Sequence, residues 1–298
     1  MRGVTSLFLA ITLGLGCMVW ISVPVFSFEW PVEEPRVISS FGTPEGNNYK
    51  KGIEIISSTE KISPIEGGEV IFHSREYKKG IHDIPSPIGN SVVLQHERGI
   101  RSVYGHLREP VDENIEYFGL NEEFGNMGST GISDGTYLSL LIIDSEVNRF
   151  VNPLLSLPSL ADTFEPQLNR VSLLGDEKDF VLGDDNTVPQ GKYTLLIDTF
   201  DLASATDSLH PMAPYSIKVY MNGEEQVSLS FESITTDQWT AVPTTPLRVD
   251  ASTLYSGEWE YQLGLVTLQP GEAVIEVFVN DFAGNESSAT HRLQVLSR

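Results

Sequence analysis

The chain has 298 residues, of which 40% are hydrophobic and 20% are charged, so it can bury one large core or two ordinary ones and is not typical of disorder. Its 41 acidic and 19 basic residues give a net charge of −22, which argues against binding of nucleic acid or of acidic lipid surfaces. The single cysteine, Cys17, excludes a disulfide framework and a thiolate zinc knuckle.

The amino terminus is typical of an export signal. Arg2 is the only charged residue before Glu29, and a long apolar stretch lies between them. We predict a signal peptide over residues 1–27, cleaved after Ser27, and therefore a protein exported to the periplasm or the cell surface. Two alternatives stay open. The stretch is long enough to be retained as a membrane anchor, and Leu15-Gly16-Cys17 matches the last part of a lipid-attachment motif.

The rest of the chain divides near residue 160. A polar stretch with a proline at residues 161–166 marks the boundary, so we predict one domain over residues 28–160 and another over residues 161–298. Each half has its own strands and apolar segments, so we expect both to be all-β and to fold independently after a cut between Leu160 and Glu165. The strand patterns include Glu69–Phe72, Ser91–Leu94, Leu138–Ile143, Tyr193–Ile197 and Ala273–Val279.

Several segments of the first half follow one another in a distinctive order: Ile38–Gly42, Lys51–Ile55, Ile65–Val70, Gly89–His96, Tyr104–Leu107 and the glycine-rich Met127–Ser139. This order and spacing resemble the lysostaphin-type (LytM-like) zinc metallopeptidases, which cut peptide cross-links in bacterial cell walls. The resemblance covers roughly residues 30–157. It implies an antiparallel β fold whose central strands line a groove. In the second half, Val274–Val279 leads into Asp281–Asn285, which resembles the last hairpin of immunoglobulin-like or fibronectin type III-like modules, so we expect a β-sandwich there.

The glycine-rich turn before Tyr137 is the most specific piece of the resemblance. It contains Gly128, Gly131 and Gly135. Because glycine tolerates positive φ, we expect all three to form a tight loop that leads into a groove strand. Each glycine alone would be typical of an ordinary surface turn, but together they follow the other segments in order.

The zinc site that the resemblance implies is not retained in this sequence. The family holds its metal with a His, an Asp four residues later and the second His of a His-x-His motif. The matching residues here are Lys50, Glu54 and Ser139. A protonated lysine has no free lone pair, and a hydroxyl is a poor zinc ligand beside imidazole. We therefore predict that the chain has no zinc cofactor.

Two further positions of the family orient water and stabilise the oxyanion. His106 is retained at one of them, and Tyr137 replaces a histidine at the other. Catalysis by the family mechanism is therefore not expected. We expect Lys50 and Glu54 to form an ion pair where zinc would lie, with the hydroxyls of Ser139 and Tyr137 as its hydrogen-bond partners.

Other candidate sites are weaker. We interpret His96 as an imidazole satisfied beside a hairpin rather than as a catalytic group. Asp184-Asp185-Asn186 and Asp198–Asp201 offer oxygen ligands for calcium, but neither matches a calcium-binding loop. In the second half, Asn222-Gly223 between two alternating stretches predicts a β-hairpin, because both residues accept positive φ.

The leading functional hypothesis is an exported, catalytically degenerate protein of the cell envelope that binds peptidoglycan or regulates a cell-wall hydrolase. One alternative is an active zinc endopeptidase with an atypical site at Glu54 and His106. A third hypothesis is a purely structural envelope protein. Zinc content and muropeptide binding discriminate among the three.

Overall fold

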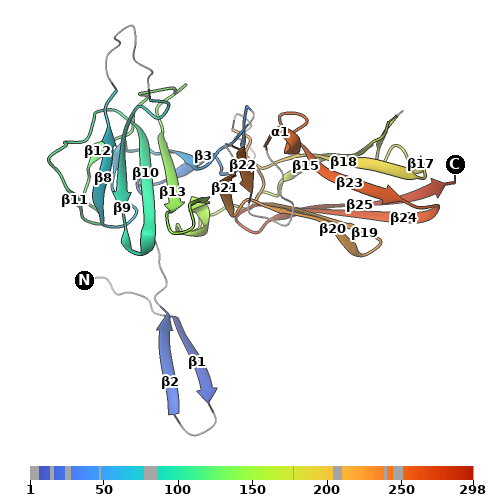
Figure 1. The fold of residues 1–298 in the computed structure, drawn as a ribbon, viewed down its shortest axis with the longest axis horizontal. Coiled ribbons are helices and arrows are strands. Elements are labelled where there is room, and N and C mark those ends of the chain that lie inside the picture. The colour runs from blue at the N-terminus through green and yellow to red at the C-terminus, as the bar shows by residue number, and fades with distance from the viewer. Residues whose placement is uncertain are drawn as a thin grey trace.

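The computed structural model describes residues 7–13, 17–23, 28–46, 48–76, 86–176, 178–203, 210–237, 240–243 and 251–297. Almost all regular structure in these ranges is β-strand, and most strand pairs are antiparallel (Figure 1). The predicted all-β class is therefore confirmed. The α-helix described, α1 (Ala251–Leu254), is a single turn.

The first described segment is a hairpin within the predicted signal peptide. Strands β1 (Leu7–Leu13) and β2 (Cys17–Val23) pair antiparallel. Among the described residues there is no helix with the length and apolar character needed to cross a membrane. The predicted cleavage site after Ser27 lies outside the described residues, so export stays a prediction.

One large sheet dominates the first half. Its central strands are antiparallel neighbours, and alternate side chains point to opposite faces, so that Leu138, Leu140 and Ile142 of β13 are buried. The strand order is β11 (Tyr117–Phe118), β8 (Gly68–Ser74), β9 (Asn90–Gln95), β10 (Ile100–Leu107), β13 (Leu138–Asp144), β14 (Arg149–Val151), β21 (Ser233–Asp237) and β22 (Thr240–Pro243), with β6 (Ile53–Ile56) on β13 and β3 (Arg36–Ser39) on β6. Short pairs flank it: β4 (Pro44–Glu45) with β5 (Asn48–Tyr49), and β7 (Lys61–Ile62) with β12 (Gly125–Asn126).

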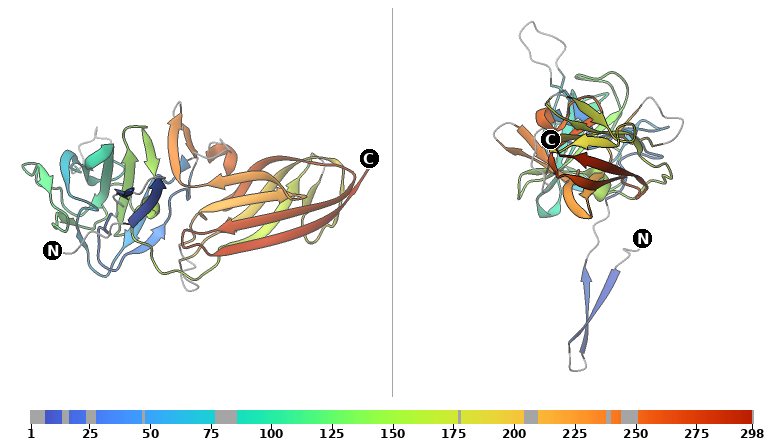
Figure 2. Two further views of the ribbon diagram at one scale, coloured as in Figure 1. Left: turned by 90° about the horizontal axis from the view of Figure 1, so that it is seen from below. Right: turned by 90° about the vertical axis from the view of Figure 1, so that its right-hand side faces the viewer.

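The second half contains two sheets that form layers (Figure 2). Asn222 and Gly223 join β19 (Ser216–Met221) to β20 (Glu224–Ser230) with φ values of 53° and 81°, which confirms the predicted hairpin. The first sheet has the order β16 (Asp179–Val181), β15 (Gln167–Leu174), β18 (Gly191–Phe200) and β23 (Glu260–Leu268). The second has the order β17 (Thr187–Pro189), β25 (Glu286–Leu296), β24 (Gly271–Asn280), β19 (Ser216–Met221) and β20 (Glu224–Ser230).

The two halves are joined by more than a linker. Strand β21 comes from the second half but pairs with β14 of the first, and the fully buried Ile234 lies opposite Phe150. Phe231 packs so closely on Gly42 that a Cβ added there would lie 2.4 Å from its ring. The β21–β22 hairpin thus crosses the predicted boundary near residue 160, and the halves share buried side chains.

Candidate functional site

Three neighbouring strands bring together the residues that the sequence singled out. Ser139 of β13 lies opposite Glu54 of β6 on one side and opposite Gly105 of β10 on the other. Gly105 precedes His106, and Lys50 follows β5 directly. We call Lys50, Glu54, His106, Tyr137 and Ser139 together the Lys50–Glu54 site.

Lys50 and Glu54 form the predicted ion pair. The Lys50 Nζ donates a hydrogen bond to the Glu54 carboxylate. Their side chains are only 17% and 18% exposed, so the pair is largely removed from water. The Glu45 carboxylate lies 3.8 Å from the same Nζ. The ammonium therefore neutralises a carboxylate that would be costly to bury alone.

His106 is held firmly within the site. Its backbone φ of 63° is unusual for a residue with a side chain, and its amide donates to the Ile88 carbonyl at 2.7 Å. The ring Nδ1 lies 2.8 Å from the Thr130 carbonyl oxygen. A carbonyl only accepts, so Nδ1 carries a proton, and in the neutral ring the lone pair is then on Nε2. The ring packs edge-on against Tyr137, with centroids 4.9 Å apart.

The expected support from two hydroxyls is not found. In the described part of the chain, neither Ser139 nor Tyr137 makes a hydrogen bond to the Lys50–Glu54 pair. Burial raises the pKa of the Tyr137 phenol, and the negative charge of Glu54 adds to this rise. The Glu54 charge therefore acts on the Tyr137 phenol although the two side chains form no hydrogen bond.

The donors at the Lys50–Glu54 site do not fit a catalytic zinc ion. Zinc needs imidazole, thiolate or carboxylate groups with free lone pairs, whereas Lys50 is a cation and Glu54 is engaged by it. His106 contributes the only imidazole at these positions, and Ser139 contributes a hydroxyl. This donor set supports no step of a zinc-dependent hydrolysis.

The three glycines before Tyr137 have different roles. Gly131 has the expected positive φ, 82°, and a Cβ there would lie 2.3 Å from the Gly89 amide nitrogen. The expectation was wrong for Gly128 and Gly135, which do not have positive φ. Gly128 is needed because a Cβ would lie 2.5 Å from the Arg108 backbone, whereas the nearest such contact at Gly135 is 4.0 Å away. Gly128 and Gly131 thus fit this loop against the strands around His106.

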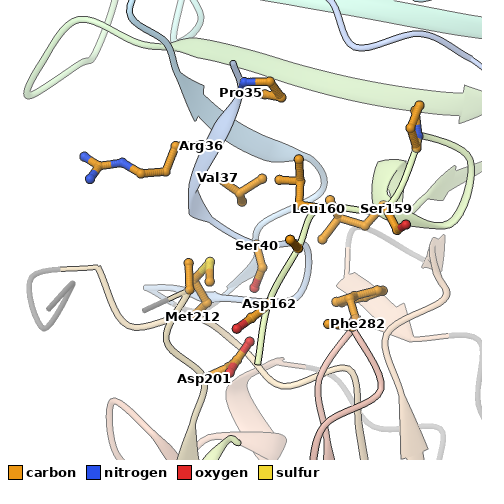
Figure 3. A pocket seen from close by; sticks show the side chains of 15 residues that line it. Pro35, Arg36, Val37, Ser40, Ser159, Leu160, Asp162, Asp201, Met212 and Phe282 are labelled. Atoms are coloured by element: carbon orange, nitrogen blue, oxygen red, sulfur yellow. The ribbon is translucent and has the colours of Figure 1, made fainter. Parts of the chain in front are cut away.

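A second charged group was missed by the sequence analysis. Asp162, Asp201 and Asp281 present carboxylate oxygens that all lie within 4.8 Å of one another. Figure 3 shows Asp162 and Asp201. Only Asp201 belongs to one of the two calcium candidates considered from the sequence. Asp185 of the other candidate lies 3.3 Å from Lys178 Nζ instead. The three aspartates are far apart along the chain, so no spacing could have revealed them.

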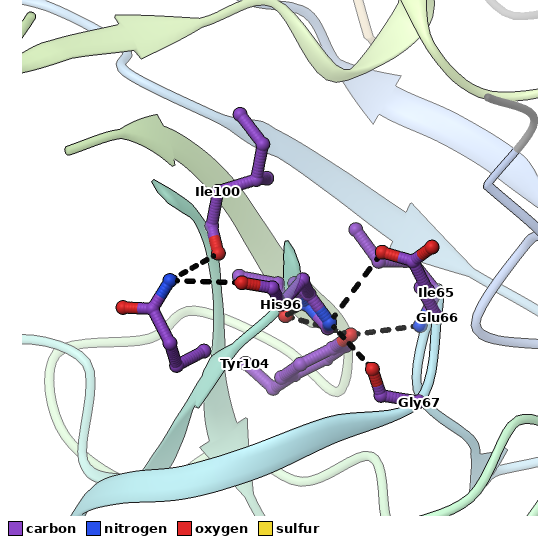
Figure 4. Close-up of polar contacts among 8 residues, drawn as sticks. Ile65, Glu66, Gly67, His96, Ile100 and Tyr104 are labelled. Atoms are coloured by element: carbon purple, nitrogen blue, oxygen red, sulfur yellow. Dashed lines mark hydrogen bonds and ion pairs between the residues drawn. The ribbon is translucent and has the colours of Figure 1, made fainter. Parts of the chain in front are cut away.

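His96 belongs to a buried hydrogen-bond network (Figure 4). Its Nε2 is 2.6 Å from Ser102 Oγ, its Nδ1 is 3.2 Å from the Gly67 carbonyl, and the Glu66 carboxylate is 4.0 Å away. A serine, a histidine and an acid suggest nucleophilic catalysis, but Ser102 is 0% exposed and no substrate could reach it. Burial lowers the pKa of His96. The interpretation of His96 as a satisfied imidazole is confirmed.

The chain is similar to known proteins in parts of its sequence and in its fold. A family model that carries no functional description matches residues 165–296. An uncharacterized protein of Treponema pallidum (strain Nichols) is 25% identical over 104 residues, which are 33% of this chain and 69% of that protein.

Among solved structures, a chain of the SpoIIQ–SpoIIIAH pore-forming complex is similar with a TM-score of 0.36 and 20% identity, over 45% of this chain and 92% of that one. A zinc-containing peptidase from Vibrio cholerae gives a TM-score of 0.37 and 17% identity, over 49% of this chain and 45% of that one, so the match spans less than half of the peptidase. Lysostaphin gives a TM-score of 0.35 and 13% identity, over 86% of this chain and 91% of that one. These values assign no activity to this chain.

Proposed function

We propose that the chain is an exported cell-envelope protein whose first half resembles a peptidase but does not hydrolyse peptides with zinc. In this proposal it binds peptidoglycan or a cell-wall hydrolase through the surface around the Lys50–Glu54 site. The observation that carries the proposal is the ion pair itself, because an ammonium stands beside the carboxylate where a metal ligand set would need an imidazole.

The ligand-binding part of the proposal rests on His106. Its Nδ1 is engaged by Thr130, so in the neutral ring Nε2 holds a lone pair that can accept a hydrogen bond from a peptide amide. The residue is only 5% exposed, so the amide has to enter the site to reach it. The ring is fixed by a strained backbone and by Tyr137, so little conformational entropy is lost on binding. A rigid acceptor at the junction of β10 and the glycine loop is suited to recognition of a peptide group.

The first experiment measures zinc and hydrolysis. We expect the purified full chain to contain no stoichiometric zinc after incubation with the metal, and to leave cross-linked wall peptides uncut with or without a chelator. Stoichiometric zinc, or cleavage abolished by a chelator, would instead support an active endopeptidase.

The second experiment measures binding of soluble muropeptides by calorimetry. We expect His106→Ala to weaken binding about tenfold or more, because one fixed hydrogen-bond partner is lost. His73→Ala is the matched control, since His73 is exposed on β8 and is not part of the Lys50–Glu54 site. If the full chain binds neither muropeptides nor a cell-wall hydrolase, the proposal is wrong and a structural role is favoured.

A further inference from the structure

An open cavity of about 370 Å³ lies where the two halves meet (Figure 3). Its walls come from β3, from the segment that follows the short 3-10 turn Pro153–Leu155 (η2), from the chain beyond β18 and from the turn between β24 and β25. Most of the lining side chains are apolar, among them Val37, Leu154, Leu160, Met212 and Phe282. This size and lining are typical of sites for small organic ligands.

Two carboxylates line one part of this otherwise largely apolar cavity. Asp162 and Asp201 line the cavity, and Figure 3 shows their carboxylates close to each other. Asp281 completes the cluster next to them. Asp201 and Asp281 are only 6% and 2% exposed, so water does little to screen their charges.

No cation of the described residues neutralises the cluster. None of the ion pairs in these ranges involves Asp162, Asp201 or Asp281. Arg36 lines the same cavity, but Figure 3 shows its guanidinium extending away from the two labelled carboxylates. The cavity thus combines an apolar wall with unbalanced negative charge.

The backbone satisfies the three carboxylates unequally. Asp281 accepts hydrogen bonds from the Gly284 amide at 2.7 Å and from both nitrogens of Asn285, and these bonds fix the turn after β24. Among the described residues, Asp201 accepts from the Leu202 amide at 2.8 Å, and Asp162 accepts from the Phe164 amide at 2.9 Å. The two carboxylates that line the cavity are therefore the ones with hydrogen-bonding capacity left for a ligand.

We propose that this cavity binds an organic ammonium ion, with the cationic head held by Asp162 and Asp201 and an apolar body packed against Val37, Met212 and Phe282. Charge complementarity determines the head group, because a cation would offset the repulsion among the three carboxylates. The apolar wall determines the body, since a bare metal ion would leave most of the cavity without a contact. This site is independent of the Lys50–Glu54 site.

The test uses the full chain at pH 8 and follows amide NMR shifts during titration with n-hexylammonium. Methylammonium, n-hexanol and calcium chloride are titrated in parallel. We expect n-hexylammonium to bind at least tenfold more tightly than n-hexanol, which lacks the charge, and than methylammonium, which lacks the apolar body. The shifted amides should surround Val37, Met212 and Phe282.

Variants test the carboxylates. Asp201→Asn should reduce the preference for n-hexylammonium over n-hexanol to less than about twofold, and Asp162→Asn should reduce it as well. Asp184→Asn is the matched control, because Asp184 is an exposed aspartate of the same half that does not line the cavity, and it should leave the preference unchanged. Equal binding of n-hexylammonium and n-hexanol would overturn the proposal. So would calcium binding that n-hexylammonium cannot displace, because the cluster would then be a metal site.

Discussion

Two charged sites of this molecule differ in how their charge is balanced. At the Lys50–Glu54 site, a carboxylate with little exposure is paired with an ammonium from its own half. At the cavity between the halves, three carboxylates converge without a cation from the described residues. The first site is complete as it stands, whereas the second carries an electrostatic cost that a ligand can offset. The paired charges of the first site therefore belong to the folded structure itself, whereas the unpaired carboxylates of the second site indicate a place for a bound cation.

The largest expected effect comes from separating the two halves. The ion pair lies within the first half, whereas the cavity needs both halves. The isolated fragment 28–160 would lose β21, β22 and Phe231, and burial of a phenylalanine side chain alone is worth about 1.5–3 kcal/mol. We expect this fragment to unfold at a much lower urea concentration than the full chain. Fragment 161–298 should restore part of the loss when it is added.

The expectation that a cut between Leu160 and Glu165 leaves two independent domains stays a prediction, and the pairing of β21 with β14 argues against it. A fragment 28–160 with a dispersed amide spectrum and the urea midpoint of the full chain would show that the shared contacts contribute little. The Lys50–Glu54 pair would then be supported by its own half alone.

The second prediction concerns Asp201→Asn. Burial raises the pKa of Asp201 from 3.8 to about 7, and the charges of Asp281 and Asp162 add to the rise. The folded state therefore holds this proton more tightly than the unfolded chain, so stability falls as the pH rises from about 4 to about 7. At pH 8 the substitution should stabilise the free protein by up to roughly 4 kcal/mol, and below pH 4 the gain should vanish.

Urea unfolding at several pH values measures this effect. The charged groups known to act on Asp201 are Asp281 and Asp162, so Asp162→Asn should give a smaller gain in the same direction. Asp184→Asn should change nothing. A loss of stability at pH 8 in Asp201→Asn would mean that the cluster is neutralised by a cation in the free protein.

The sequence predicted the first of these sites much better than the second. Lys50 and Glu54 stand at two positions where the resemblance implies metal ligands, so their pairing could be expected once the fold was assumed. Asp162, Asp201 and Asp281 meet only through the packing of distant segments, and no local pattern specifies that. The same limit applies to β21, whose pairing with β14 depends on tertiary contacts. At Gly128, the constraint is the nearby Arg108 backbone rather than φ, and composition cannot distinguish the two.

The third prediction concerns Lys50→Ala, which would leave Glu54 unpaired at a position with little exposure. Removing one partner of a largely buried pair should cost about 2 kcal/mol in the free energy of unfolding. The double variant Lys50→Ala/Glu54→Ala should recover most of this loss, because no charge is then stranded. No zinc binding should appear in either variant, since no imidazole is gained.

An exposed ion pair in the same half provides the control for Lys50→Ala. Lys61 lies 2.9 Å from Glu123, with side chains 63% and 53% exposed. Lys61→Ala should cost less than about 1 kcal/mol, because water screens such pairs. Equal losses in the two lysine variants would show that burial does not distinguish the Lys50–Glu54 pair.

The smallest effects are expected at the two hydroxyls beside the ion pair. Tyr137→Phe removes the hydroxyl of a buried side chain and should cost about 1 kcal/mol. Ser139→Ala removes no hydrogen bond among the described residues and should cost less than about 0.5 kcal/mol. Combined with Lys50→Ala, each loss should simply add, because neither hydroxyl is bonded to the pair. Urea unfolding of the single and double variants measures this additivity. A Ser139→Ala loss that disappears once Lys50 is removed would mean that the serine supports the pair in solution. The ion pair would then depend on a further polar group for its stability. The two sites would differ less in how far their charges are balanced.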